Sequence, residues 1–146
     1  MSATAHGDPY NLQRFVDAQD PVYSQVCAEL RAGCKRSHWM WFIFPQIQGL
    51  GYSPMARKFA IASLAEAEAY LDHPVLGARL RECCRLVNVV EGRSIREIFG
   101  YPDDLKFRSS ITLFARAAPG NQVFQDALEK YFNGEPDPLT LARLEA

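Results

Sequence analysis

Apolar residues recur through most of the chain at intervals of three and four positions, which is the spacing of one face of an α-helix. Tyr23, Val26, Cys27 and Leu30 show this spacing plainly. Corresponding patterns predict helices over residues 12–19, 23–30, 54–62, 64–71, 74–90, 104–118, 122–132 and 137–146. The pattern therefore predicts an all-α fold, a compact bundle of about seven to nine short helices.

Boundary signals agree with this periodicity. Asp or Ser is a good N-cap, and proline suits the first helical position because its missing N–H would be unpaired there. Such pairs begin at Asp8, Asp20, Ser53 and Asp137. Capping boxes begin at Ser63 and Ser94. Helices are expected to stop at Gly33, Gly92, Gly100 and Gly134.

The stretch "KRSHWMWFIFPQIQGLG", residues 35–51, is less easily assigned. Its aromatic residues favour a strand, but a strand needs a neighbour to pair its backbone groups. The partner it would need, "SSITLF" at residues 109–114, lies in a segment with helical periodicity. We therefore predict a short helix over residues 37–44, N-capped by Ser37 and ended by Pro45, in the middle of the bundle. A two-stranded insertion is the alternative.

Composition excludes several classes of protein. The chain of 146 residues suits one domain. It has 16 basic and 17 acidic side chains, so its net charge of −1 provides no overall field to attract nucleic acid or an anionic membrane. No apolar run approaches the roughly 20 residues that span a bilayer. We predict a cytoplasmic protein with a disordered tail at residues 1–7 and a single domain at residues 8–146.

The four cysteines are Cys27, Cys34, Cys83 and Cys84, and they form no C-x-x-C motif. In a cytosolic protein they are expected to be reduced and mostly buried. A zinc site built on Cys34 and His38 would lack a second ligand pair. We therefore predict neither a metal nor a cofactor.

The aromatic stretch carries the first candidate site residues. His38 belongs to the residue type that most often serves in general acid–base catalysis. The competing interpretation is a buried histidine bonded to a backbone carbonyl. Trp41 lies three positions further on, so it shares a face with His38 better than Trp39 does, although core packing would also explain it. Gln46 follows Pro45, where the chain must leave the helix.

A second polar cluster, "YPDDLKFRSS", lies at the entrance of a predicted helix and contains Asp104, Lys106 and Ser109. Asp103 or Asp104 would serve as an N-cap. Lys106 stands between Leu105 and Phe107 without an evident local partner, which favours a place in a pocket.

"GLGYS", residues 49–53, leads into the helix that is predicted to begin at Pro54. Backbone N–H groups at such a helix start could receive a phosphate. A plain turn that feeds a capped helix is the competing interpretation.

Three long motifs carry a resemblance to a known family: "GCKRSHWMWFIFPQIQGLGYS", "EAEAYLDHPVLGARL" and "YPDDLKFRSSITLF". With "YNLQRFVDAQ" and "KYFNGEPDPLTL" they resemble domain-of-unknown-function family 1810, a family of small bacterial proteins. The resemblance covers Asp8 to Leu144. It implies an all-helical fold and no established reaction. Some members carry a calpastatin label, which neither a repeated motif nor a disordered composition supports here.

The prediction for function is a small molecule, nucleotide-like or phosphosugar-like, bound between the "SHWMWF" helix and the "DDLK" segment. The protein would be either a binding protein or an enzyme. The catalytic candidates are His38, Lys106 and Asp104, and the ligand-binding candidates are Trp41, Gln46 and Ser109. The alternative is a protein-interaction or regulatory module that uses exposed aromatic residues without catalysis. Near-neutral charge argues against a third class, nucleic-acid binders. The oligomeric state is left open.

Overall fold

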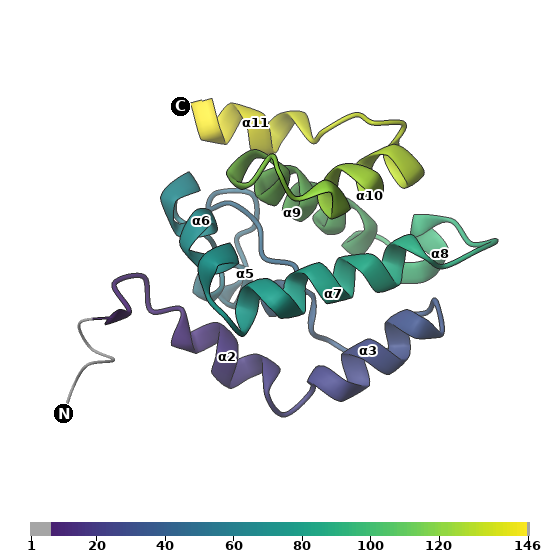
Figure 1. The fold of residues 1–146 in the computed structure, drawn as a ribbon, viewed down its shortest axis with the longest axis horizontal. Coiled ribbons are helices and arrows are strands. Elements are labelled where there is room, and N and C mark those ends of the chain that lie inside the picture. Colours follow the sequence, from purple (N-terminus) through teal and green to yellow (C-terminus); the bar gives the residue numbers. More distant parts are fainter. Residues whose placement is uncertain (1–6, 146) are drawn as a thin grey trace.

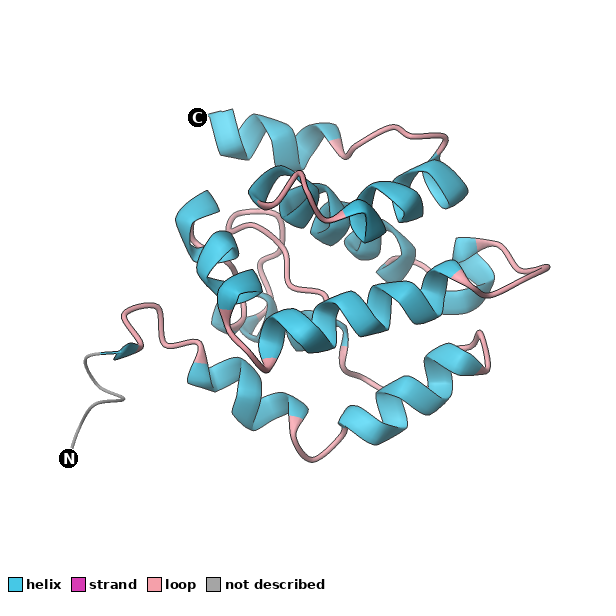
Figure 2. Cartoon of the chain, viewed as in Figure 1, coloured by secondary structure: helices cyan, strands magenta, loops and turns pink. Residues whose placement is uncertain are grey.

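The computed structural model describes residues 7–145, and within that range it contains ten helices (Figures 1 and 2). They are α2 (Gln13–Gln19), α3 (Tyr23–Arg31), α4 (Met40–Ile43), α5 (Pro54–Lys58), α6 (Leu64–Asp72), α7 (Leu76–Asn88), α8 (Ile95–Phe99), α9 (Asp103–Ala117), α10 (Gln122–Phe132) and α11 (Pro138–Glu145). The predicted all-α class is confirmed. Most of the predicted tail, Met1 to His6, lies outside the described residues.

Helix α9 is the element around which the others are arranged. It packs against α10, α6, α8 and α11, while α7 packs against α10, α6 and α3. Figure 1 shows α11 lying over α9, with α2 and α3 on the opposite side of α7. Two polar residues in the middle of α9, Ser109 and Thr112, contact Asp137 at the start of α11.

The aromatic stretch lies in the core, as predicted. Trp39, Phe42 and Phe44 are buried. The Phe44 ring meets Phe107 of α9 edge-on at 5.0 Å between ring centroids, and Phe107 stacks on Phe99 at 4.8 Å. Such aromatic pairs add about 0.5–1.5 kcal/mol beyond the burial of their area. The stretch thus joins α8 and α9 to the segment that follows α4.

The helix in this stretch is shorter than predicted, because α4 spans only Met40–Ile43. Its N-cap position is Trp39, which makes no side-chain cap. The predicted cap residue, Ser37, instead directs its hydroxyl at the Glu29 carboxylate, 2.6 Å away. The Glu29 carboxylate also binds the backbone N–H groups of Arg36 and Ser37, so residues before Trp39 have partners without forming a helical turn. Pro45 follows the end of α4, as predicted.

Other boundary predictions succeed where the cap is local. Ser53 accepts a hydrogen bond from the Ala56 N–H at 3.1 Å, with Pro54 at the first helical position, so the "GLGYS" turn feeds a capped helix. Ser94 forms a complete capping box with Glu97. Gly33, Gly100 and Gly134 follow the ends of α3, α8 and α10 with positive φ, as predicted. Gly92 also has positive φ, but it does not end α7, whose last residue is Asn88.

Two further boundary predictions, at Asp20 and at the end of α5, are wrong because tertiary partners take over. Asp20 was expected to cap the second helix, but it ends α2 and forms an ion pair with Arg79 at 2.9 Å. Helix α5 ends at Lys58 and not at residue 62. The next residues are extended because the Ile61 N–H bonds to the Gln46 carbonyl, within an isolated bridge between Ile47 and Ile61. This bridge also differs from the pairing with residues 109–114 that the strand alternative required.

Candidate functional site

A groove of about 640 Å³ runs between residues 46–56, the first half of α9 and the start of α11. We call it the Lys106 groove. Its polar lining includes Gln46, Tyr52, Lys106, Arg108, Ser109 and Asp137. Three segments that are distant in sequence therefore bring hydrogen-bonding groups to one concave surface.

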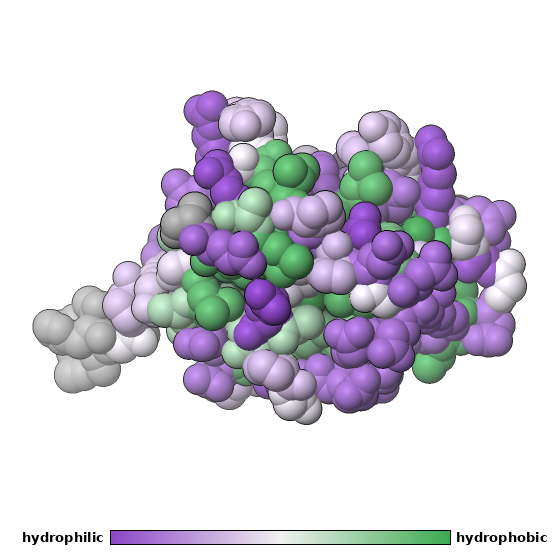
Figure 3. Space-filling model, turned by 90° about the horizontal axis from the view of Figure 1, so that it is seen from above, coloured by the Kyte–Doolittle hydropathy of each residue, from purple (hydrophilic) through white to green (hydrophobic). Residues whose placement is uncertain are grey.

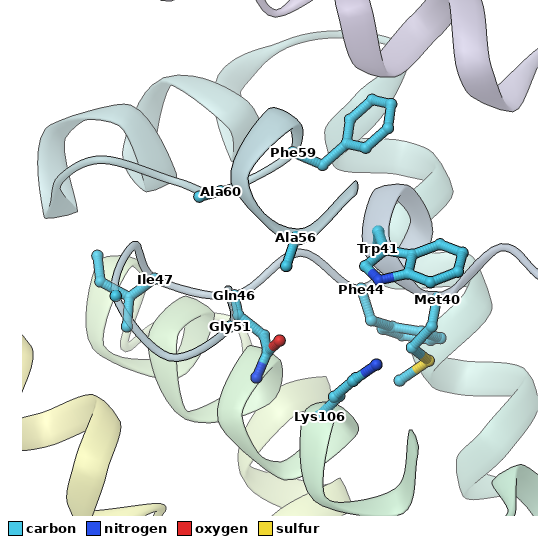
Figure 4. Close-up of a pocket in the computed structure, with 11 residues that line it drawn as sticks. Met40, Trp41, Phe44, Gln46, Ile47, Gly51, Ala56, Phe59, Ala60 and Lys106 are labelled. Carbon is cyan, nitrogen blue, oxygen red and sulfur yellow. The ribbon is translucent and has the colours of Figure 1, made fainter. Parts of the chain in front are cut away.

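A smaller hollow adjoins the groove and is closed on one side by Trp41 (Figure 4). The two spaces share Gln46, Gly51, Ala56 and Lys106. The hollow has a volume of about 10 Å³, which is room for about one water molecule. A ligand larger than a water molecule would therefore lie in the groove, and Trp41 would lie behind the Lys106 side chain.

Lys106 takes part in a chain of charges. Its Nζ lies 3.4 Å from Asp103 Oδ1 and 5.4 Å from the centroid of the Trp41 ring. The other carboxylate oxygen of Asp103 lies 2.9 Å from Lys35 Nζ. Two cations thus share one anion, and the three side chains carry a net charge of +1. Because Lys35 is closer to Asp103 and more buried, it supplies most of the neutralising charge.

The local sequence explains why these side chains converge. Lys106 and Ser109 are three positions apart on α9, which places them on neighbouring parts of one helix face. Gln46 follows Pro45 and leaves the helical path there. Gly49, with φ of +100°, lets the loop pass beneath α11. The positive φ favours glycine at this position, which lies against the Arg143 guanidinium of α11.

Ser109 lines the groove but also holds α11 in place. The Ser109 hydroxyl donates to Asp137 Oδ2 at 2.9 Å. Asp137 Oδ2 also accepts from the Thr140 N–H at 3.1 Å and from the Thr140 hydroxyl at 2.6 Å. Thr112 contributes by accepting from the Asp137 N–H at 2.9 Å. The Ser109 hydroxyl therefore has a structural function at the start of the last helix.

The structure does not bring every candidate residue to this site. His38 is exposed in the loop before α4 and lines neither of the two spaces that Lys106 lines. Asp104 is buried, and its Oδ1 has no hydrogen-bond partner among the described residues. It also lines neither space. Trp41, Gln46 and Lys106 meet at the hollow, while Gln46, Lys106 and Ser109 meet in the groove.

Sequence reasoning missed a polar residue of a different kind, Glu29. One carboxylate oxygen accepts from the N–H groups of Arg36 and Ser37 and from Trp39 Nε1, at 2.8, 3.2 and 2.9 Å. The other accepts from Gln25 Nε2 and the Ser37 hydroxyl. We call this arrangement the Glu29 anchor. Its sequence signal was an acidic residue three positions after Val26, next to the apolar face of its helix.

The hydrogen bonds of the anchor set the charge of Glu29. Burial alone would raise the pKa of this carboxyl. Donors from the Ser37 hydroxyl, the Arg36 N–H, Trp39 and Gln25 outweigh burial and lower the pKa to about 2. Glu29 is therefore ionised at neutral pH and holds residues 36–39 against α3.

Among residues 7–145, no group of three or more His, Cys, Asp and Glu side chains is arranged to hold a metal ion. In the same range, no helix has both the length and the apolar character needed to cross a membrane.

Comparison with known proteins identifies the family but no activity. The family model described as "Protein of unknown function (DUF1810)" matches residues 9–144. The chain is also similar to the conserved hypothetical protein Rv1873 from Mycobacterium tuberculosis, with 60% sequence identity and a TM-score of 0.94 to its crystal structure. That match covers 95% of this chain and 99% of the other. No curated protein sequence matches. The chain belongs to the DUF1810 family, as the resemblance predicted.

Proposed function

We propose that this member of the DUF1810 family binds a small anionic molecule, nucleotide-like or phosphosugar-like, in the Lys106 groove. One observation carries the proposal. Lys106 lies at the junction of the groove and the Trp41 hollow, and the anion beside it, Asp103, is already paired with Lys35 at 2.9 Å. A bound anion would therefore meet the Lys106 ammonium, whose nearest carboxylate, Asp103, is also neutralised by Lys35.

The surroundings of Lys106 suit the remaining parts of such a ligand. The groove volume of about 640 Å³ lies within the roughly 300–1,000 Å³ of small-molecule sites. The Gln46 amide can both donate and accept, as sugar hydroxyls require. Leu50 and Tyr52 offer apolar surface to a ring. Trp41 would act from behind, by holding the Lys106 ammonium through its ring face.

The proposal is for binding and assigns no reaction. Asp137 lines the groove, but its Oδ2 already receives the Ser109 and Thr140 hydroxyls and the Thr140 N–H. It is therefore committed to holding α11. His38 and Asp104, the other acid–base candidates, lie away from the groove lining.

A second candidate function is docking of a protein partner. Tyr52, Leu105 and Leu139 line the groove and are 73%, 48% and 65% exposed. Figure 3, which looks down on the molecule from above Figure 1, shows apolar side chains among polar ones on the surface in view. Exposed apolar residues around a groove are also a mark of interaction sites.

Thermal-shift measurements with nucleoside phosphates and sugar phosphates test the proposal, with the uncharged nucleosides and sugars as matched ligands. At a hundredfold excess over its dissociation constant, a ligand stabilises by about 2.7 kcal/mol. We expect the shift only with the charged member of a pair. Lys106→Met should abolish it, and Lys58→Met, which removes an exposed lysine outside the groove lining, should keep it. No shift with any phosphorylated ligand, or a shift that survives Lys106→Met, contradicts the proposal.

A further inference from the structure

A second cavity lies between α9, α10 and α11, the three helices in the upper part of Figure 1. It shares no lining residue with the Lys106 groove or with the Trp41 hollow. Its volume is about 320 Å³, at the lower end of the roughly 300–1,000 Å³ of small-molecule sites. We call it the Arg116 cavity, and a ligand that fits it is small.

Hydrogen bonds within the chain hold the walls of the Arg116 cavity in place. The loop between α10 and α11 is fixed to α9, because the Arg108 guanidinium binds the carbonyls of Glu135 and Pro136 at 3.0 and 3.2 Å. The Thr112 hydroxyl accepts from the Asp137 N–H at 2.9 Å. Pro136 and Thr112 both line the cavity. A ligand therefore meets a formed cavity and orders little of the chain when it binds.

The lining combines apolar side chains with one charge. Leu128 is 2% exposed, and Ala115 and Leu141 are half-buried. Of the described residues that line the cavity, Arg116 alone is charged. Its Nη2 lies 3.9 Å from Glu145 Oε2, and these two side chains are 55% and 71% exposed. Solvent screens such a pair, so Arg116 is free to exchange Glu145 for an anion from solution.

Asn121 adds a hydrogen-bond donor to the same lining. Its Oδ1 accepts from Arg81 Nε at 2.8 Å, which fixes the orientation of the amide. The Nδ2 amino group is then the part of the amide that remains available, and it can only donate. Within the described residues Nδ2 has no acceptor, and it is open to solvent. The cavity thus offers a cation and a neutral donor, both suited to an anion.

We propose that the Arg116 cavity binds a small amphipathic monocarboxylate. Its hydrocarbon part would pack against Ala115, Leu128 and Leu141. Its carboxylate would bind Arg116, because a guanidinium presents two parallel N–H groups that match the two carboxylate oxygens. Asn121 Nδ2 would supply a further donor. A single cation in an apolar lining favours a ligand with one negative charge over a phosphorylated one, which carries more.

Chemical-shift titration of the isotope-labelled full chain with hexanoate tests the proposal. Hexanol has a similar hydrocarbon chain without the charge, and acetate has the charge without the chain. We expect hexanoate to bind about tenfold or more tightly than either, since the charged hydrogen bonds and the buried chain both contribute. The backbone amide signals of Ala115, Gln125 and Leu141 should shift, whereas those of Gln46 and Tyr52 in the Lys106 groove should not.

Matched variants separate the Arg116 cavity from general attraction of anions. Arg116→Met should weaken hexanoate binding about tenfold or more. Arg57→Met, which removes an exposed arginine outside the cavity lining, should leave binding unchanged, and so should Lys106→Met. Ala115→Phe should fill the cavity and abolish binding. Circular dichroism checks the fold of this variant, and the surface variant Arg116→Met keeps the test decisive if Ala115→Phe does not fold.

Four results would overturn the proposal. The first is equal binding of hexanoate and hexanol, and the second is equal binding of hexanoate by Arg116→Met and Arg57→Met. The third is a hexanoate titration that shifts the signals of the Lys106 groove and leaves those of the Arg116 cavity unmoved. The fourth is the absence of any shift in the cavity signals up to the solubility limit of hexanoate.

Discussion

The Glu29 anchor and the Lys106 groove both place charged groups beside the same aromatic core, but these charged groups differ in burial and in their hydrogen-bonding partners. In the anchor, five donors surround one buried carboxylate and hold residues 36–39. In the groove, the Lys106 ammonium is half-exposed and shares Asp103 with Lys35. Glu29 therefore has its partners within the fold, whereas Lys106 has room for a partner from outside.

This difference distinguishes a charged side chain that stabilises the fold from one that is available to bind a ligand. A buried charge whose hydrogen-bond partners all belong to the chain stabilises the fold. Its removal leaves those partners without a hydrogen bond. A half-exposed charge on a concave surface contributes little to stability because solvent screens it. The two regions should therefore respond differently to mutation, although each contains a charged residue and a tryptophan.

The largest expected effect is that of Glu29→Ala. The change leaves Trp39 Nε1 and the N–H groups of Arg36 and Ser37 without their acceptor. Unsatisfied buried groups cost about 1–3 kcal/mol each, so we expect a loss of about 3–5 kcal/mol in the free energy of unfolding. Equilibrium unfolding in urea measures it. Glu68→Ala, on the exposed face of α6, should stay within about 0.5 kcal/mol of wild type; an equally small effect for Glu29→Ala would contradict the anchor.

The second effect is a dependence of stability on pH that belongs to Glu29. Its pKa falls from an ordinary 4.5 to about 2 on folding, so the unfolded chain binds the proton more readily. The stabilisation is complete above about pH 4.5 and is lost as the pH falls toward 2, with a total on the order of 3 kcal/mol.

Urea unfolding of wild type and Glu29→Gln across this range isolates the contribution. The stability difference between the two proteins should shrink as the pH is lowered. A difference that stays constant from about pH 5 to pH 2 would mean that Glu29 does not titrate as described.

A smaller effect is expected for Ser109→Ala, which lies where the groove and the fold meet. The change removes one of the groups bound to Asp137 Oδ2, but Thr140 still binds it. We expect a loss of about 1–2 kcal/mol, since the acceptor is charged. Amide hydrogen exchange in α11 should quicken relative to Ser24→Ala, an exposed change on α3. Unchanged exchange in α11 would mean that Ser109 does not hold this helix.

Local signals made most of the fold predictable. Apolar spacing and the caps at Ser53, Ser94 and Asp137 act within one helix, so the sequence displays both partners. Ser37 and Asp20 were misassigned because Glu29 and Arg79, from other elements, compete for the same groups. Helix α5 was overextended for a similar reason, since the Ile61 N–H finds its partner in residue 46.

The candidate site was only partly accessible to such reasoning. Lys106 was singled out because no local partner was evident, Trp41 because it shares a helix face with His38, and Gln46 because the chain leaves the helix after Pro45. The structure brings Trp41, Gln46 and Lys106 together. His38, singled out as an acid–base candidate, lies on the surface outside the groove. Asp104 is buried but does not reach it. The Lys35–Asp103 ion pair neutralises the carboxylate beside Lys106. It joins residues 68 positions apart and leaves no pattern in the sequence.

The most direct test of the account is the unfolding free energy of Lys106→Met, measured in urea beside wild type and Glu29→Ala. Lys106 is 28% exposed, and its ion pair with Asp103 is 3.4 Å long. Because Lys35 remains to neutralise Asp103, we expect Lys106→Met to lie within about 0.5 kcal/mol of wild type. A loss of about 2 kcal/mol or more, approaching that of Glu29→Ala, would show that Lys106 is part of the fold and would contradict the distinction between the two regions.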